Sequence, residues 1–192
     1  LAPSLFVTSR GELLLFANQK SGEYLSLRYA LSRDGATWSS FQPLVSDGQV
    51  PTNFLAHHAV FQGRDYVVYQ TLRSGEQRYH LQIMSSQDGG WTWGAARPLD
   101  FDETVDGKVQ GPELFSNQRP FLASLPDRLG LVWERQYQSR PARVYFLELD
   151  AQGGLLGQPQ AVTEGSAAAF FPRLIRYRER SYMFFFSGAD KV

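Results

Sequence analysis

Residues 85–93 read SSQDGGWTW, a sequence that joins turn-forming residues directly to two tryptophans. Aspartate accepts hydrogen bonds from nearby backbone N–H groups and glycine tolerates positive φ, so we expect a hairpin tip at Asp88, Gly89 and Gly90. The side chains of Trp91 and Trp93 need burial. The stretch is therefore predicted to be a turn that carries its own hydrophobic anchor.

Residues 31–38 repeat this pattern as LSRDGATW, with one residue fewer. The aspartates of the two copies are 54 residues apart. A period of this size is typical of propellers and solenoids, in which each unit packs on its neighbours. The matched positions are Ser32 and Ser86, Asp34 and Asp88, Gly35 and Gly89, Thr37 and Thr92, and Trp38 and Trp93, and Gly90 has no partner in the shorter copy.

Around each turn, short apolar runs return in the same order. Runs rich in Val, Leu, Phe and Tyr that end at Gly, Asp, Asn or Ser are typical of strands. No stretch has a convincing helical period. The expected strands lie at 3–8, 12–19, 23–32 and 41–46, then 58–62, 66–71, 78–86 and 96–101, then 119–124, 129–136, 143–150 and 158–163, and finally 171–177 and 181–188.

These strands predict an all-β chain, a β-propeller of four-stranded antiparallel blades with about three and a half blades present. The blades are expected at 1–48, 49–104, 110–165 and, incomplete, 166–192. Because an open propeller exposes an unpaired strand edge, we expect a fragment of a larger propeller, completed by its parent chain or a second copy. The start at Leu1, without Met or a signal-like segment, also favours a processed or excised piece.

Composition excludes several classes of protein. The chain is 43% hydrophobic and 14% aromatic, which favours a folded domain over disorder. Acidic and basic residues are equal in number, so no charge footprint for nucleic acid is present. No apolar run reaches the roughly 20 residues of a membrane span. The absence of cysteine excludes disulfides and thiolate metal sites.

The stretch SSQDGGWTW resembles the Asp-box, or bacterial neuraminidase repeat, with its pattern Ser-x-Asp-Gly-Gly-x-Thr-Trp. Residues 149–160, LDAQGGLLGQPQ, resemble a decayed third copy in which Asp150, Gly153 and Gly154 survive. The resemblance implies a sialidase-like β-propeller, a fold used by sialidases, other glycan-processing enzymes and non-catalytic binding domains. In that family the box is structural and lies away from the ligand-binding mouth, which identifies the fold and not the chemistry.

The resemblance implies a ligand site lined by residues near the start of each unit. These are Ser4, His57 and His58, Asn117 and Arg119, and Arg173. Sialidases resemble one another in clamping a substrate carboxylate with several arginines, because a guanidinium pairs with it bidentately. They also use a tyrosine nucleophile with a glutamate, and an aspartate as acid/base. The predicted ligand-binding residues are Arg119, Arg173, His58, Tyr69 and Tyr137, the two tyrosines because they lie near strand ends and are expected to be exposed.

The sequence does not identify the catalytic residues. Residues 2–6 read APSLF, where the family has an arginine in a Phe/Tyr-Arg-Ile-Pro stretch. Glu113, Glu134 and Tyr137 could supply a glutamate and a tyrosine by position alone. His57 and His58 are adjacent on a strand and point to opposite faces, so we predict no metal site there, and no cofactor.

These departures favour a non-catalytic ligand-recognition or sensor module of a secreted or periplasmic bacterial protein, binding a glycan or a protein partner at the propeller mouth. The alternative is an exo-sialidase-like or five-bladed furanosidase-like glycoside hydrolase whose catalytic residues lie partly outside this chain. A third role, as an assembly scaffold, would require a large exposed apolar patch.

Overall fold

The computed structural model describes residues 3–21, 24–45, 52–72, 76–99, 104–105, 108–109 and 115–188. Every secondary-structure element in these ranges is a β-strand, so the predicted all-β class is confirmed. The described residues contain no helix long and apolar enough to cross a membrane. The strands are β1 (Ser4–Val7), β2 (Leu13–Ser21), β3 (Tyr24–Ser32), β4 (Gln42–Pro43), β5 (Thr52–Phe61), β6 (Arg64–Leu72), β7 (Tyr79–Ser86), β8 (Arg97–Leu99), β9 (Thr104–Val105), β10 (Lys108–Val109), β11 (Phe115–Ser124), β12 (Leu129–Tyr137), β13 (Arg143–Leu149), β14 (Leu155–Ala161), β15 (Ala168–Tyr177) and β16 (Arg180–Gly188).

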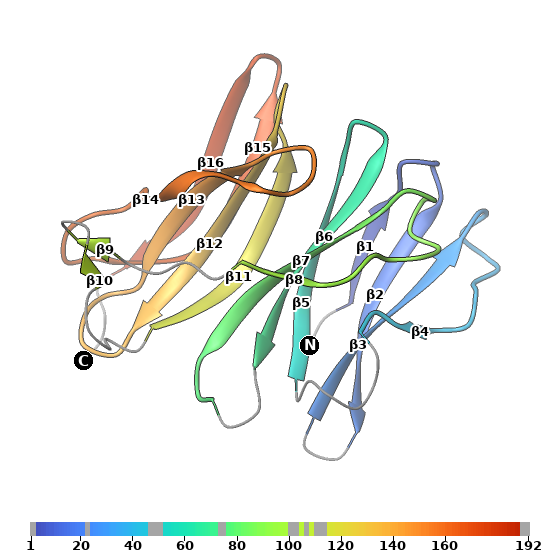
Figure 1. Cartoon of the computed structure of the whole chain (residues 1–192), viewed down its shortest axis with the longest axis horizontal. Helices are drawn as coiled ribbons and strands as arrows, with labels where there is room; N and C mark the ends of the chain where they lie inside the picture. Colours follow the sequence, from blue (N-terminus) through green and yellow to red (C-terminus); the bar gives the residue numbers. More distant parts are fainter. Residues whose placement is uncertain are drawn as a thin grey trace.

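The strands form successive antiparallel sets that follow one another across the molecule in chain order (Figure 1). Set 1 is β1–β4, set 2 is β5–β8, set 3 is β11–β14 and set 4 is β15–β16; β9 and β10 form a separate two-stranded pair. One parallel pairing, Leu25 with Thr52, joins sets 1 and 2 into a single sheet. No closed sheet forms among the described residues.

Apolar side chains fill the layers between consecutive sets. One cluster joins residues of set 1, such as Leu14 and Phe16, to residues of set 2, such as Val67 and Met84. A second cluster joins the opposite face of set 2 to set 3, where Trp133 is fully buried. A middle set with two buried faces explains why β6 reads as a nearly continuous buried run.

The turn after β7 has the hydrogen bonds that its sequence predicts. The Asp88 carboxylate accepts bonds from the Ser86 hydroxyl (2.7 Å), the Thr92 N–H (2.9 Å) and the Thr92 hydroxyl (2.6 Å). Gly89 and Gly90 both have positive φ. Burial would raise the pKa of Asp88, but the hydrogen bonds from Thr92, Ser86 and the Trp91 backbone outweigh it and lower the pKa to about 2.

The same turn anchors set 2 onto set 1, but the expected burial of Trp91 is wrong, since its side chain is 42% exposed, and only Trp93 is partly buried. The Trp93 ring packs against Phe16 and Tyr29, with centroid separations of 6.3 and 6.2 Å. The Trp91 indole N–H donates to the Glu12 carboxylate at 2.7 Å. The Tyr29 hydroxyl donates to the Trp91 carbonyl at 3.1 Å. The turn is therefore a structural link between two sets.

The other two turns follow the same scheme. Asp34 accepts the N–H groups of Ala36 and Thr37 at 2.9 and 2.7 Å, and Trp38 is partly exposed. In the third copy the Asp150 carboxylate accepts the Gly154 N–H at 2.6 Å. There the Tyr66 hydroxyl donates to the Ala151 carbonyl, which ties this turn back to set 2 as Tyr29 ties the second turn to set 1.

Replacing Asp88 with alanine is expected to lower the free energy of unfolding by about 1 kcal/mol, because a partly exposed turn loses its carboxylate hydrogen bonds. Urea denaturation measures this change. Asp34→Ala is the matched control: it removes the same kind of turn bonds, but the Asp88 turn also holds the Trp91 and Trp93 contacts to set 1, so a smaller loss is expected for Asp34→Ala. An equal loss for both variants would contradict the anchoring role of the second turn.

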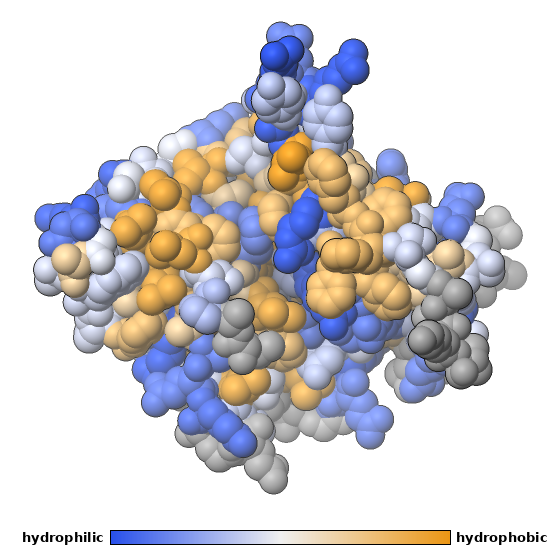
Figure 2. Space-filling view, turned by 180° about the vertical axis from the view of Figure 1, so that it is seen from behind, coloured by the Kyte–Doolittle hydropathy of each residue, from blue (hydrophilic) through white to orange (hydrophobic). Residues whose placement is uncertain are grey.

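Set 4 exposes large apolar side chains. Figure 2 shows a broad hydrophobic area on the side of the molecule where β15 and β16 lie. On these two strands Phe184 is 54% exposed, Phe186 is 73% exposed and Tyr177 is 59% exposed. Such an apolar sheet face is uncommon on an isolated soluble domain and is typical of a surface that another layer covers.

Candidate functional site

The first strands of sets 2, 3 and 4 carry a bulge at the same place. The pairing register shifts between Phe54 and His57, between Gln118 and Phe121, and between Phe170 and Arg173. Each bulge contains one non-glycine residue with positive φ: Leu55 (53°), Arg119 (49°) and Phe171 (53°). This conformation is unfavourable for L residues, and such strain concentrates at functional sites. The three bulges define one edge of the molecule, which we call the bulge edge.

Side chains of the preceding set hold two of these bulges in place. The side-chain amide oxygen of Gln70 accepts the backbone N–H of Arg119 at 3.1 Å. The Glu134 carboxylate accepts the backbone N–H of Phe171 at 3.3 Å. Gln70 and Glu134 are equivalent, since each pairs with the residue just before the bulge of its own set. Phe186 has this position in set 4 and carries no acceptor.

Arg119 and Glu134 form the charged centre of the bulge edge. The guanidinium of Arg119 donates to Glu134 at 2.7 Å and lies 4.4 Å from the centroid of the Phe171 ring. The Glu134 side chain is completely buried, and that of Arg119 is 29% exposed. Gln136 donates to the same carboxylate oxygen at 2.6 Å. A buried carboxylate thus fixes the Arg119 guanidinium, while part of the Arg119 side chain remains exposed to solvent.

The position after each bulge brings His57, Phe121 and Arg173 together. The His57 and Phe121 rings lie 3.7 Å apart by centroid, and the Arg173 guanidinium lies 5.3 Å from the Phe121 ring. His57 Nδ1 accepts the Leu122 N–H at 3.2 Å. Burial, together with the nearby charges of Arg173 and His58, lowers the pKa of His57 to about 3. The imidazole is therefore neutral at physiological pH.

The structure separates the five predicted ligand residues into three groups. Arg119 and Arg173 lie on the adjacent strands β11 and β15 of the bulge edge. Tyr137 lies at the end of β12, in a separate cavity. Two residues are interior: His58 bonds to the buried Asp65 at 2.8 Å, and Tyr69 is 1% exposed.

The expected exposure of Tyr69 is wrong. Set 1 covers this face of β6, so Tyr69 belongs to the apolar cluster between sets 1 and 2. Asn117, also expected at the channel, is buried and accepts bonds from Trp133 and Arg135 at 2.9 and 3.0 Å. Glu113 lies outside the described residues. Among the described residues no group of three or more acidic, histidine or cysteine side chains is arranged to hold a metal ion.

The sequence interpretation missed Gln70 as part of this edge, and it considered Phe171 only as one of several aromatic rings that could stack on a sugar. The dipeptides Arg119-Pro120 and Phe171-Pro172 recur 52 residues apart, close to the turn period. A residue before proline is restricted in conformation, so this repeat could have indicated a special backbone position.

Comparisons with known proteins bear on the fold. No family model matches the chain, and no curated protein matches it. Among solved structures, it is similar to an α-L-arabinanase of Penicillium chrysogenum in complex with arabinobiose, with a TM-score of 0.67 and 16% identity over 97% of this chain and 58% of that one. The similarity supports a β-propeller type of fold for this chain.

Two further structures support this fold. A Hadza microbial sialidase matches with a TM-score of 0.65 and 14% identity, over 90% of this chain and 39% of the sialidase. A protein of unknown function from Dyadobacter fermentans matches with a TM-score of 0.70 and 16% identity, over 97% of this chain and 49% of that one. The chain therefore spans about two fifths to three fifths of the length of these propeller structures.

Proposed function

We propose that this chain is part of a glycoside hydrolase of the β-propeller kind, and that the bulge edge binds the sugar. The observation that carries this proposal is Arg119, a strained and partly exposed arginine held by a buried glutamate on a fold that arabinanases and a sialidase share. A guanidinium fixed in this way presents its remaining N–H donors to a carboxylate or to sugar hydroxyl groups. Arg173, on the adjacent strand, is the second proposed ligand residue.

The proposal includes a larger propeller than the chain itself forms. Two observations support it: set 4 has two described strands with exposed aromatic residues, and the similar structures are considerably longer. In this view sets 1, 2 and 3 are blades, set 4 is half a blade, and the catalytic carboxylates lie partly in blades supplied by the parent chain or a second copy. A secreted or periplasmic location also remains a prediction.

A non-catalytic glycan-binding module is the second candidate. It is favoured by the bonding of Glu134, because both of its carboxylate oxygens accept hydrogen bonds from the protein. A carboxylate occupied in this way positions Arg119 and is not free to act as an acid or base.

Turnover of small glycosides tests the proposal. The chain, alone and within any longer protein that contains it, is incubated with 4-methylumbelliferyl sialoside and with p-nitrophenyl α-L-arabinofuranoside. We expect turnover of one substrate, with kcat/KM at least about tenfold lower for Arg119→Ala because a substrate contact is lost. Arg176→Ala, an exposed arginine on β15, is the matched control and should stay near the wild-type value.

One outcome would overturn the hydrolase proposal, and another would overturn the placement of its site. Glycan binding without turnover would favour the non-catalytic module. Turnover that is equal in wild type and Arg119→Ala would place the active site away from the bulge edge.

A further inference from the structure

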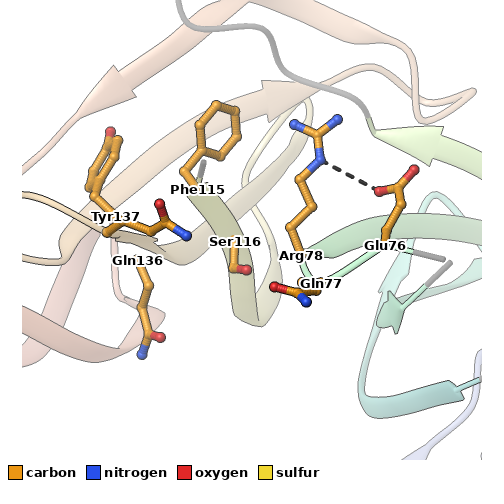
Figure 3. Close-up of a pocket in the computed structure, with 8 residues that line it drawn as sticks. Glu76, Gln77, Arg78, Phe115, Ser116, Gln136 and Tyr137 are labelled. Atoms are coloured by element: carbon orange, nitrogen blue, oxygen red, sulfur yellow. Dashed lines mark hydrogen bonds and ion pairs between the residues drawn. The ribbon is translucent and has the colours of Figure 1, made fainter. Parts of the chain in front are cut away.

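A second candidate site lies between sets 2 and 3, away from the bulge edge. It is a cavity of about 450 Å³, a size typical of small-ligand sites. Its walls come from the start of β11 and the end of β12 on one side, and from residues just before β7 on the other (Figure 3). The Ser116 hydroxyl accepts the Tyr79 N–H at 3.2 Å, which joins the two walls.

Aromatic rings form one wall of this cavity. Figure 3 shows the side chains of Phe115 and Tyr137 pointing to the same side, and their ring centroids are 6.2 Å apart. The guanidinium of the buried Arg135 lies 4.2 Å from the Phe115 ring, and that of Arg140 lies 3.7 Å from the Tyr137 ring. The Tyr137 and Tyr145 hydroxyls bond at 2.5 Å. The rings are therefore held in place before any ligand arrives.

The charged groups of the opposite wall compensate one another. Arg78 pairs with Glu76 at 3.5 Å, and His80 bonds to the same Glu76 oxygen at 2.5 Å. Gln77 and Gln138 add exposed amides, which both donate and accept hydrogen bonds. The charged lining residues are one carboxylate, Glu76, and one guanidinium, Arg78, and they pair with each other. Aromatic rings beside exposed amides suit a neutral polyhydroxylated ring, whose apolar face stacks on an aromatic side chain while its hydroxyls bond to amides.

The cavity and the bulge edge are formed by neighbouring residues of β12. Gln136 lines the cavity, but its side chain points to the other side in Figure 3 and bonds to Glu134 at 2.6 Å. Tyr137, the next residue, faces the cavity because neighbouring side chains on a strand alternate. Gln136 therefore belongs to both regions, whereas substitutions of Tyr137 and Gln138 change the cavity without removing a bond to Glu134 that holds the bulge edge.

The geometry points to this cavity as a binding site for a neutral sugar, distinct from the Arg119 site. The inference rests on the proposed carbohydrate function, and it names the substrate class as a glycan with at least one uncharged sugar unit. Tyr137 and Phe115 supply the stacking surface, and Gln138 supplies hydrogen bonds to hydroxyl groups.

Calorimetric titration tests the inference with defined probes. Arabinobiose, xylobiose and galactobiose represent neutral sugars, and 3′-sialyllactose represents an anionic one. We expect at least one neutral disaccharide to bind. Its affinity should be at least about tenfold lower for Tyr137→Ala, lower for Gln138→Ala, and within about twofold of wild type for Tyr137→Phe, which keeps the ring. Binding of no neutral disaccharide, or equal binding by wild type and Gln138→Ala, would overturn the inference.

Two controls keep the result interpretable. Thermal unfolding shows whether Tyr137→Ala is folded, and the exposed Gln138 gives a variant that leaves the core untouched. Arg176→Ala, which changes an exposed arginine of β15, should bind the neutral disaccharide within about twofold of wild type. Sugar binding without glycoside turnover would refute the hydrolase proposal and support the sugar site in the cavity. Turnover without Tyr137-dependent binding would support the hydrolase proposal and refute the sugar site in the cavity.

Discussion

Replacing Glu134 with alanine is expected to lower the free energy of unfolding by about 3 kcal/mol. The variant leaves three donors without their acceptor: the Arg119 guanidinium, the Gln136 amide and the Phe171 N–H. Breaking a buried ion pair by removing one partner costs about 3–5 kcal/mol, and the lower end applies because water reaches part of Arg119. The loss should be visible as an earlier midpoint in urea.

Glu148→Ala is the matched control for this prediction. Its ion pair with Arg128 is also short, 2.6 Å, but both side chains are 34% exposed. Surface pairs of this kind contribute about 0–1 kcal/mol. Glu134→Gln, which keeps an acceptor oxygen, should lie between the two. If Glu134→Ala were no more destabilising than Glu148→Ala, the bulge edge would not depend on the buried carboxylate.

Acidification from pH 7 to pH 5 is expected to lower the free energy of unfolding by about 1–2 kcal/mol through His57 alone. Its pKa falls from the ordinary 6.5 to about 3 in the folded chain. Between these values the unfolded state takes up a proton that the folded state does not, so stability is complete above pH 6.5 and declines below it. Partial exposure of the ring reduces the full linkage value to this range.

Denaturation at several pH values measures the effect, with His57→Asn as the comparison because asparagine does not titrate. The slope of stability against pH between 5 and 7 should be smaller in the variant. The aspartates with lowered pKa values, Asp34, Asp65, Asp88 and Asp127, are ionised throughout this interval and act only at lower pH. Parallel curves for wild type and His57→Asn would refute the role of His57.

Much of the fold could be predicted because it depends on local chemistry. The turn at Asp88 is stabilised by hydrogen bonds among its own hydroxyl and carboxylate groups. Trp93 packs against the apolar cluster between sets 1 and 2, as an apolar side chain next to a neighbouring layer is expected to do. The strand starts were less predictable. β5 begins at Thr52 and β11 at Phe115, several residues before the apolar runs that predicted them. Bulges at Leu55 and Arg119 interrupt the alternation there, so the first halves of these strands carry no clear strand pattern.

The candidate site was harder to predict because its residues depend on partners from other sets. Arg119 and Arg173 were named from position near the strand starts, but the bond from Glu134 to the Phe171 N–H joins two sets and has no local signal. Tyr69 was misjudged for the same reason, since a strand in the middle of a stack is covered on both faces.

The way the bulges at Arg119 and Phe171 are held has a consequence for how the protein is made. Gln70 precedes Arg119 in the chain, and Glu134 precedes Phe171, so every acceptor leaves the ribosome before the backbone that it fixes. The turn at Trp91 likewise returns to Glu12, a residue translated earlier. Each new set can therefore dock on a finished surface during synthesis, which matches the vectorial order of translation.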